Sequence, residues 1–90
     1  MLKIKDEVDL KELEKFGFEY YGNYNRGNCW RRENIIFKKN GKDFINGITI
    51  SENFNKEISY LYPYAVFEYP PIENYIIDLI KADLVEKVEE

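Results

Sequence analysis

The dipeptide Asn40-Gly41 constrains the fold of this chain more than any other short segment. It lies between two runs rich in apolar residues, IIFKK at residues 35–39 and KDFINGITI at residues 42–50. An Asn-Gly pair in this position is the strongest short signal for a β-hairpin, because both residues tolerate the positive φ that a two-residue turn requires. The sequence therefore predicts antiparallel strands on both sides of this dipeptide.

A second hairpin is expected just before the first. The run FEYYGNY at residues 18–24 leads into turn-forming residues at 25–28, and CWRR continues at residues 29–32. Together with the Asn40-Gly41 hairpin, these runs predict a sheet built mainly from strands that are neighbours in the sequence.

The run after Asn40-Gly41 contains an interruption. Phe44, Ile48 and Ile50 share one face of a strand, but Asn46 and Gly47 break the alternation of apolar and polar residues. This break is either a β-bulge or a second tight turn. We favour the bulge, because it keeps one long strand opposite the preceding run.

The N-terminal region carries the signals of a short helix over residues 10–16. Asp9 can cap its first turn, with Glu12 three positions later as the reciprocal partner. Gly17 supplies the left-handed residue that ends a helix. Two turns are not stable alone, so the apolar side chains must dock on the rest of the protein. These side chains are Leu10, Leu13 and Phe16.

The C-terminal region predicts a longer helix. Pro70 and Pro71 precede it, and proline is favoured in the first helical turn. Apolar residues then follow at helical spacing, which predicts a helix over residues 72–82 with one apolar stripe. The stripe consists of Ile72, Tyr75, Ile76, Leu79 and Ile80.

The remaining segments leave alternatives open. Residues 51–57 read as a polar loop, and residues 58–69 as one strand or two, with Pro63 at an edge or a break. The tail at 84–90 is either a short edge strand or a frayed helical end. The expected fold class is α+β, with a small antiparallel sheet of about four to five strands and an N-terminal and a C-terminal helix packed on one face. Residues 1–90 are expected to form a single domain.

The composition removes most of the usual groups of catalysis and metal binding. The chain has no His, and its one cysteine, Cys29, has no imidazole to activate it as a nucleophile. We find no Gly-rich phosphate loop and no two-metal carboxylate pattern. We therefore expect a non-enzymatic protein without a metal or cofactor. The charged first residues match neither a signal peptide nor a membrane anchor, so a cytoplasmic location is expected.

Charge is unevenly distributed along the chain, although the formal net charge is −4. Residues 26–43 carry six basic groups against two acidic ones, and residues 68–90 carry seven acidic groups against two basic ones. This asymmetry suits oriented docking onto a macromolecule. Tyr, Trp and Arg, which dominate binding hot spots, also concentrate on the first predicted hairpin. The candidate partner-binding residues are Tyr20, Tyr21, Tyr24, Trp30, Arg31 and Arg32.

Three alternatives to a protein-binding surface stand beside this hypothesis. The basic and aromatic hairpin at 20–43 also suits a single-stranded nucleic-acid platform, with cations for phosphates and rings for bases. The sparsely charged run at 58–69 suits edge-to-edge pairing with a second copy of the chain, which gives a homodimer. Alternatively, the aromatic side chains pack against the helices and the charges are simply solvated.

Two segments, EVDLKELEKFGF at 7–18 and DLIKADLVEKV at 78–88, resemble the ends of short uncharacterised proteins of prophages, phages and mobile elements in low-GC Gram-positive bacteria. In those proteins an opening helix that ends in Phe-Gly-Phe is followed by a few strands and a closing helix. The resemblance covers about a quarter of the chain. It implies a phage-type protein that binds a host macromolecule, and in its most specific form an anti-defence inhibitor such as an anti-CRISPR protein. It carries over no catalytic residue.

Overall fold

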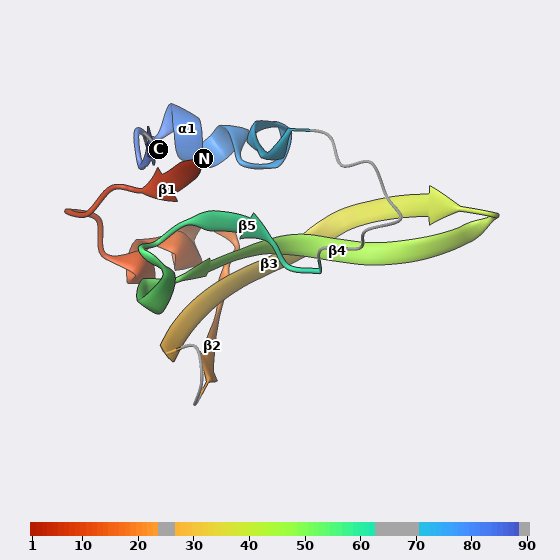
Figure 1. Ribbon diagram of the computed structural model, residues 1–90, viewed down its shortest axis with the longest axis horizontal. Helices are drawn as coiled ribbons and strands as arrows, with labels where there is room; N and C mark the ends of the chain where they lie inside the picture. The colour runs from red at the N-terminus through yellow and green to blue at the C-terminus, as the bar shows by residue number, and fades with distance from the viewer. Residues whose placement is uncertain (24–26, 63–70, 89–90) are drawn as a thin grey trace.

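The computed structural model describes residues 1–23, 27–62 and 71–88, and these form an α+β fold with two antiparallel sheets (Figure 1). The strands are β1 (Leu2–Ile4), β2 (Glu19–Asn23), β3 (Gly27–Lys39), β4 (Lys42–Ser51), β5 (Ile58–Tyr60) and β6 (Val85–Lys87). The helical segments are the 3₁₀ helices η1 (Leu10–Phe16), η2 (Glu52–Phe54) and η3 (Ile72–Tyr75) and the α-helix α1 (Ile77–Lys81). One sheet has the order β2-β3-β4-β5, and the other joins β1 to β6.

The two predicted hairpins are confirmed. Strands β3 and β4 meet at a two-residue turn in which Asn40 has a φ of 52° and Gly41 a φ of 75°, as an Asn-Gly turn requires. Strand β2 pairs with the first half of β3, whereas the second half of β3 and the first half of β4 continue beyond it. Figure 1 shows this distal part of the hairpin projecting from the rest of the molecule.

One strand, β4, runs through Asn46 and Gly47, as predicted, but the extra residue of the bulge lies on β3. Arg32 pairs with Ile48 and Ile35 with Asn46, so three steps on β3 oppose two on β4. The bulged backbone of β3 approaches β4 closely. A Cβ atom at Gly47 would lie 2.7 Å from the Cα atom of Glu33 and would overlap the carbonyl oxygen of Arg32. Gly47 is required because it leaves room for the bulge of the neighbouring strand.

The short helix at 10–16 is confirmed as η1, in 3₁₀ geometry. The Asp9 side chain caps it by accepting a hydrogen bond from the backbone N–H of Lys11. Gly17 ends it with a φ of 83°, and the backbone N–H of Phe18 then donates to the carbonyl oxygen of Leu13 at 3.2 Å. These caps match the sequence signals, although the Glu12 carboxylate accepts a hydrogen bond from Lys15.

The prediction of one continuous helix over 72–82 is wrong. Ile76, with a φ of −129°, separates η3 from α1. In a continuous α-helix, the carbonyl oxygen of Tyr75 would accept from the backbone N–H of Leu79. Instead, Arg32 Nη2 donates to that carbonyl at 2.7 Å, and the N–H of Leu79 donates to the Asp78 carboxylate. A side chain from β3 therefore binds the backbone where the helix is broken.

The first residues form a strand that the sequence analysis missed. Strand β1 pairs with β6, which confirms the edge-strand alternative for the tail. It also touches the larger sheet, since Lys3 forms an isolated bridge with Glu57 and the N–H of Ile4 donates to the carbonyl oxygen of Lys56. The alternation of Leu2, Lys3 and Ile4 was the available signal for this strand.

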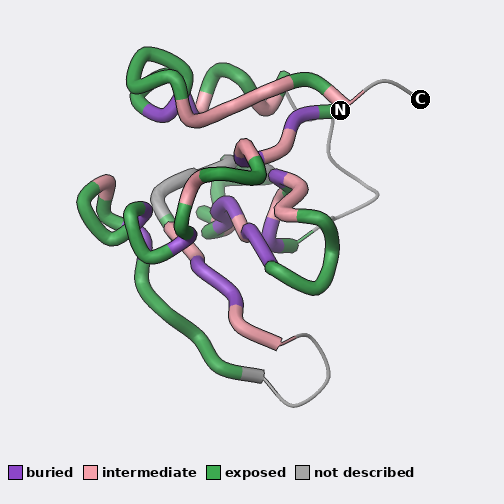
Figure 2. Tube along the Cα trace, turned by 90° about the vertical axis from the view of Figure 1, so that its left-hand side faces the viewer, coloured by how far each residue is buried: buried purple, intermediate pink, exposed green. Residues whose placement is uncertain are grey.

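One apolar core joins both sheets and the helical segments, and Figure 2 shows buried stretches spread over the strands and helical turns. Its buried members are Leu2, Ile4, Leu10, Leu13, Phe18, Trp30, Ile48, Ile50, Ile58, Ile76 and Leu79. The helical segments are short, and their packing as two helices on one sheet face stays a prediction. None of the described helices is long and apolar enough to cross a membrane. The predicted strand run at 58–69 contains β5, while residues 63–69 lie outside the described part.

Candidate functional site

The four-stranded sheet has two different faces, because successive side chains of a strand point to opposite sides. Trp30, Ile48, Ile50 and Ile58 belong to the core. The residues that alternate with them lie on the opposite side, which we call the outer sheet face. This face comprises Glu19, Tyr21, Cys29, Arg31, Thr49, Ser51 and Ser59.

On the outer sheet face, an arginine stacks on a tyrosine. The guanidinium carbon of Arg31 lies 4.8 Å from the centre of the Tyr21 ring, a cation–π contact. Arg31 Nε is buried without a hydrogen-bond partner. Among the described residues, the Arg31 side chain makes this ring contact but no ion pair. Because Nε is buried, the groups available to a bound partner are the two terminal nitrogens of the guanidinium, which make no hydrogen bond with the described residues. We call these two side chains the Tyr21–Arg31 pair.

Two carboxylates flank the Tyr21–Arg31 pair. The Tyr21 hydroxyl donates to Glu19 Oε2 at 3.3 Å, and Glu33 lines the same shallow groove. The negative charge of Glu19, together with partial burial, raises the pKa of Tyr21. The Tyr21 hydroxyl keeps its proton at physiological pH, as an ordinary tyrosine does, and is a hydrogen-bond donor to Glu19. The groove thus combines a flat cation, stacked on an aromatic ring, with two carboxylates. This combination favours a partner that presents charges of both signs.

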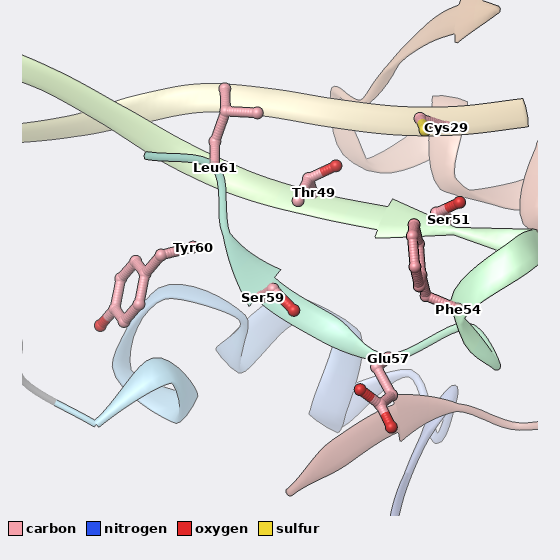
Figure 3. Close-up of a pocket in the computed structure, with 8 residues that line it drawn as sticks. All are labelled: Cys29, Thr49, Ser51, Phe54, Glu57, Ser59, Tyr60 and Leu61. Atoms are coloured by element: carbon pink, nitrogen blue, oxygen red, sulfur yellow. The ribbon is translucent and has the colours of Figure 1, made fainter. Parts of the chain in front are cut away.

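A hollow of about 320 Å³ lies at the other half of the outer sheet face, over β4 and β5. The chain has one threonine and two serines, and all three, Thr49, Ser51 and Ser59, line this hollow (Figure 3). We call it the hydroxyl pocket. Its other lining residues are Cys29, Phe54, Glu57, Tyr60 and Leu61. Small side chains on three adjacent strands leave this space, and Cys29, only 1% exposed, is buried at the β3 side.

The predicted site residues divide between the two faces. Tyr21 and Arg31 lie together on the outer sheet face, whereas Tyr20, Trp30 and Arg32 lie on the core side. The ring of Tyr20 packs edge-on against Trp30 with 5.1 Å between centroids, and its hydroxyl donates to Asn28. Tyr20 is half exposed, whereas Trp30 is buried. Tyr24 lies outside the described residues.

Arg32 is occupied within the fold. Its side chain, 11% exposed, forms an ion pair with Asp78 at 2.6 Å and donates to the carbonyl oxygens of Phe16 and Tyr75. Its guanidinium carbon also lies 4.6 Å from the Phe18 ring centre. Arg32 therefore connects η1, η3 and α1 to β3, and its role is within the fold. The signal that separates it from Arg31 is simple, because neighbours in a strand point to opposite faces.

The sequence analysis missed the hydroxyl pocket as a site. The signal was present, since Thr49 and Ser51 alternate with the buried Ile48 and Ile50. The position of Phe54 was not predictable, because it depends on the η2 turn. Within the described part of the chain, no group of three His, Cys, Asp or Glu side chains is placed to hold a metal ion. Comparisons with protein-family models, curated proteins and solved structures find no match.

Proposed function

We propose that this chain is a non-catalytic binding protein, and that its outer sheet face binds a protein partner. The observation that carries this proposal is the Tyr21–Arg31 pair. Its guanidinium stacks on the Tyr21 ring and makes no hydrogen bond or ion pair with the described residues. The terminal N–H groups of this arginine can therefore donate to a carboxylate or carbonyl of a partner. Tyr and Arg are also the types that contribute most to protein interfaces.

The charges around this pair favour a protein over a nucleic acid. Glu19 and Glu33 flank Arg31, and they repel a phosphate backbone, which carries negative charge alone, more than a protein surface of mixed charge. Two other basic groups of the hairpin are engaged within the chain, since Arg32 pairs with Asp78 and Lys38 with Asp43 at 3.4 Å. A single-stranded nucleic-acid platform needs a continuous run of cations beside its aromatic rings. Nucleic-acid binding is therefore the less favoured alternative, and the nuclease treatment described below distinguishes it from protein binding.

The biological setting that we propose rests on the resemblance at the two ends of the chain. It is that of a phage or mobile-element protein in a low-GC Gram-positive host, acting in the cytoplasm on a host macromolecule. Inhibition of a defence system such as CRISPR is the most specific form of this proposal. The asymmetric charge of the chain suits such oriented docking.

An affinity capture from a low-GC Gram-positive lysate tests the proposal. Tagged wild type, Tyr21→Ala, Arg31→Ala and the control Lys11→Ala are each incubated with and without nuclease, and bound proteins are identified by mass spectrometry. We expect a stoichiometric, nuclease-resistant protein on wild type and on Lys11→Ala. Each outer-face substitution should weaken its binding by about 30-fold, the effect of a hot-spot residue. Lys11 is an exposed residue of η1, away from the outer sheet face.

Two results would reject the proposal. Equal capture by all four proteins would show that the outer sheet face is not the interface. Capture that disappears with nuclease would assign the hairpin to nucleic acid instead. Circular dichroism of each variant confirms that the comparison is made between folded proteins.

A further inference from the structure

The polar groups that line the hydroxyl pocket are hydroxyls, which can accept as well as donate a hydrogen bond, and one carboxylate, which only accepts. Its one carboxylate is Glu57, and neither Lys nor Arg lines it. Hydroxyl oxygens of Thr49 and Ser59 supply further acceptors, and these two residues lie directly opposite each other in the β4–β5 pairing. A pocket with acceptors and a negative charge selects a guest that carries N–H donors and a positive charge.

These acceptors are available. Within the described part of the chain, the side chains of Thr49, Ser59 and Glu57 make no hydrogen bond or ion pair. Ser51 differs, because its hydroxyl oxygen accepts a hydrogen bond from the backbone N–H of Asn53. Figure 3 shows Glu57 at the end of the pocket nearest β1, with Thr49 and Ser59 on the adjacent strands.

An aromatic ring forms one wall of the pocket. Phe54, 53% exposed, projects from η2 beside Cys29 and Ser51 (Figure 3). A structured turn holds this ring: Asn55 follows η2 in the left-handed conformation, and Lys56 Nζ donates to the carbonyl oxygen of Val8 at 2.7 Å. The backbone that carries Phe54 is therefore fixed beside the pocket, and the exposed ring can stack on a flat cation.

We infer that the hydroxyl pocket binds an arginine side chain of the protein partner, an inference that rests on the proposed function. The planar guanidinium stacks on Phe54 and donates to the hydroxyls of Thr49 and Ser59 and to the Glu57 carboxylate. Arg31 lies opposite Thr49 in the β3–β4 pairing, so the Tyr21–Arg31 pair adjoins the pocket. The outer sheet face thus fits a partner surface with an arginine next to a carboxylate.

A titration with the isolated functional group tests this inference without the partner. Methylguanidinium is added to the ¹⁵N-labelled full chain, and amide shifts are followed by NMR, with methylurea as the neutral planar control. We expect saturable shifts at the amides of Thr49, Phe54, Glu57 and Ser59, with a dissociation constant on the order of 10 mM for such a small ligand. Methylurea should produce much smaller shifts.

Variants locate the interaction. Glu57→Gln and Phe54→Leu should each weaken methylguanidinium binding at least about fivefold, because each removes a charge or ring contact. Glu14→Gln, an exposed carboxylate on η1, should leave it unchanged. Absent pocket shifts, an equal response to methylurea, or equal binding by Glu57→Gln would each overturn the inference. These outcomes are separate from capture by Arg31→Ala, which tests the proposed function alone.

Discussion

At the scale of single residues, Arg31 and Arg32 are adjacent in the sequence and lie in opposite environments. Arg31 stacks on Tyr21 at the outer sheet face, and its terminal N–H groups make no hydrogen bond with the described residues. Arg32 is mostly covered, donates to two backbone carbonyls and pairs with Asp78. Composition alone cannot distinguish them, but strand alternation can, provided that the core side of the strand is known.

This difference predicts unequal losses of stability. Arg32→Ala should lower the free energy of unfolding by about 2–4 kcal/mol, because it leaves the Phe16 and Tyr75 carbonyls and the Asp78 carboxylate without their donor. Arg31→Ala should cost less than about 1 kcal/mol, as an outer-face substitution without an ion pair. Urea denaturation followed by Trp30 fluorescence measures both. Equal losses would contradict the assignment of Arg32 to the fold and Arg31 to binding.

At the scale of elements, local sequence signals predicted local structure well. The Asn40-Gly41 turn and the ends of η1 depend on one or two residues whose backbone preferences are strong, and the structure has both. The split of the C-terminal helix was not predictable from local signals, since the Tyr75 carbonyl at the break accepts a hydrogen bond from Arg32 on a distant strand. The bulge was expected from Gly47 and occurs beside it, but on β3, since the glycine accommodates its neighbour.

The same reasoning applies to the candidate site. Tyr21 and Arg31 were predicted from residue type, because hot-spot residues concentrate on the hairpin. The hydroxyl pocket was not predicted, because it requires the register of three strands and the turn that carries Phe54. The strand register and the position of this turn both depend on tertiary contacts, which no short segment of the sequence specifies.

The bulge makes a prediction about two glycines. Gly47→Ala should lower the free energy of unfolding by about 3 kcal/mol, because the new Cβ atom overlaps the backbone of β3. Gly41→Ala should cost only about 1 kcal/mol, for the positive φ of an open turn with no atom near the added carbon. Chemical denaturation compares the two. A Gly47→Ala loss no larger than that of Gly41→Ala would show that the bulge can relax.

At the scale of the whole molecule, the charge asymmetry of the sequence is partly neutralised inside the fold. Arg32 from the basic segment pairs with Asp78 from the acidic one, 46 positions apart. At the N-terminal end, Lys5 pairs with Asp83 at 2.9 Å, which helps to hold the two ends of the chain together beside the β1–β6 sheet. The charge asymmetry therefore contributes to the stability of the fold, and acid should weaken these ion pairs.

The pH dependence of stability follows from two carboxylates. A hydrogen bond and the charge of Lys3 hold the pKa of Asp6 below its usual 3.8. Partial burial opposes ionisation of Asp78, but the hydrogen bond and charge of Arg32 outweigh it, so the pKa of Asp78 is also lowered. In the unfolded chain both carboxyls titrate near pH 4, roughly the value of a free aspartate. Their contribution is therefore complete above that pH and is lost as pH falls through the lower folded-state pKa values.

We accordingly expect the free energy of unfolding to decrease between about pH 4 and pH 2, and to decrease less in the double variant Asp6→Asn, Asp78→Asn. The double variant should be less stable than wild type at pH 7, and the two proteins should converge near the acidic end of this range. Urea denaturation at a series of pH values measures the difference. A difference that stays constant with pH would mean that the substitutions act through packing, and that the Asp6–Lys3 and Asp78–Arg32 ion pairs do not contribute to stability.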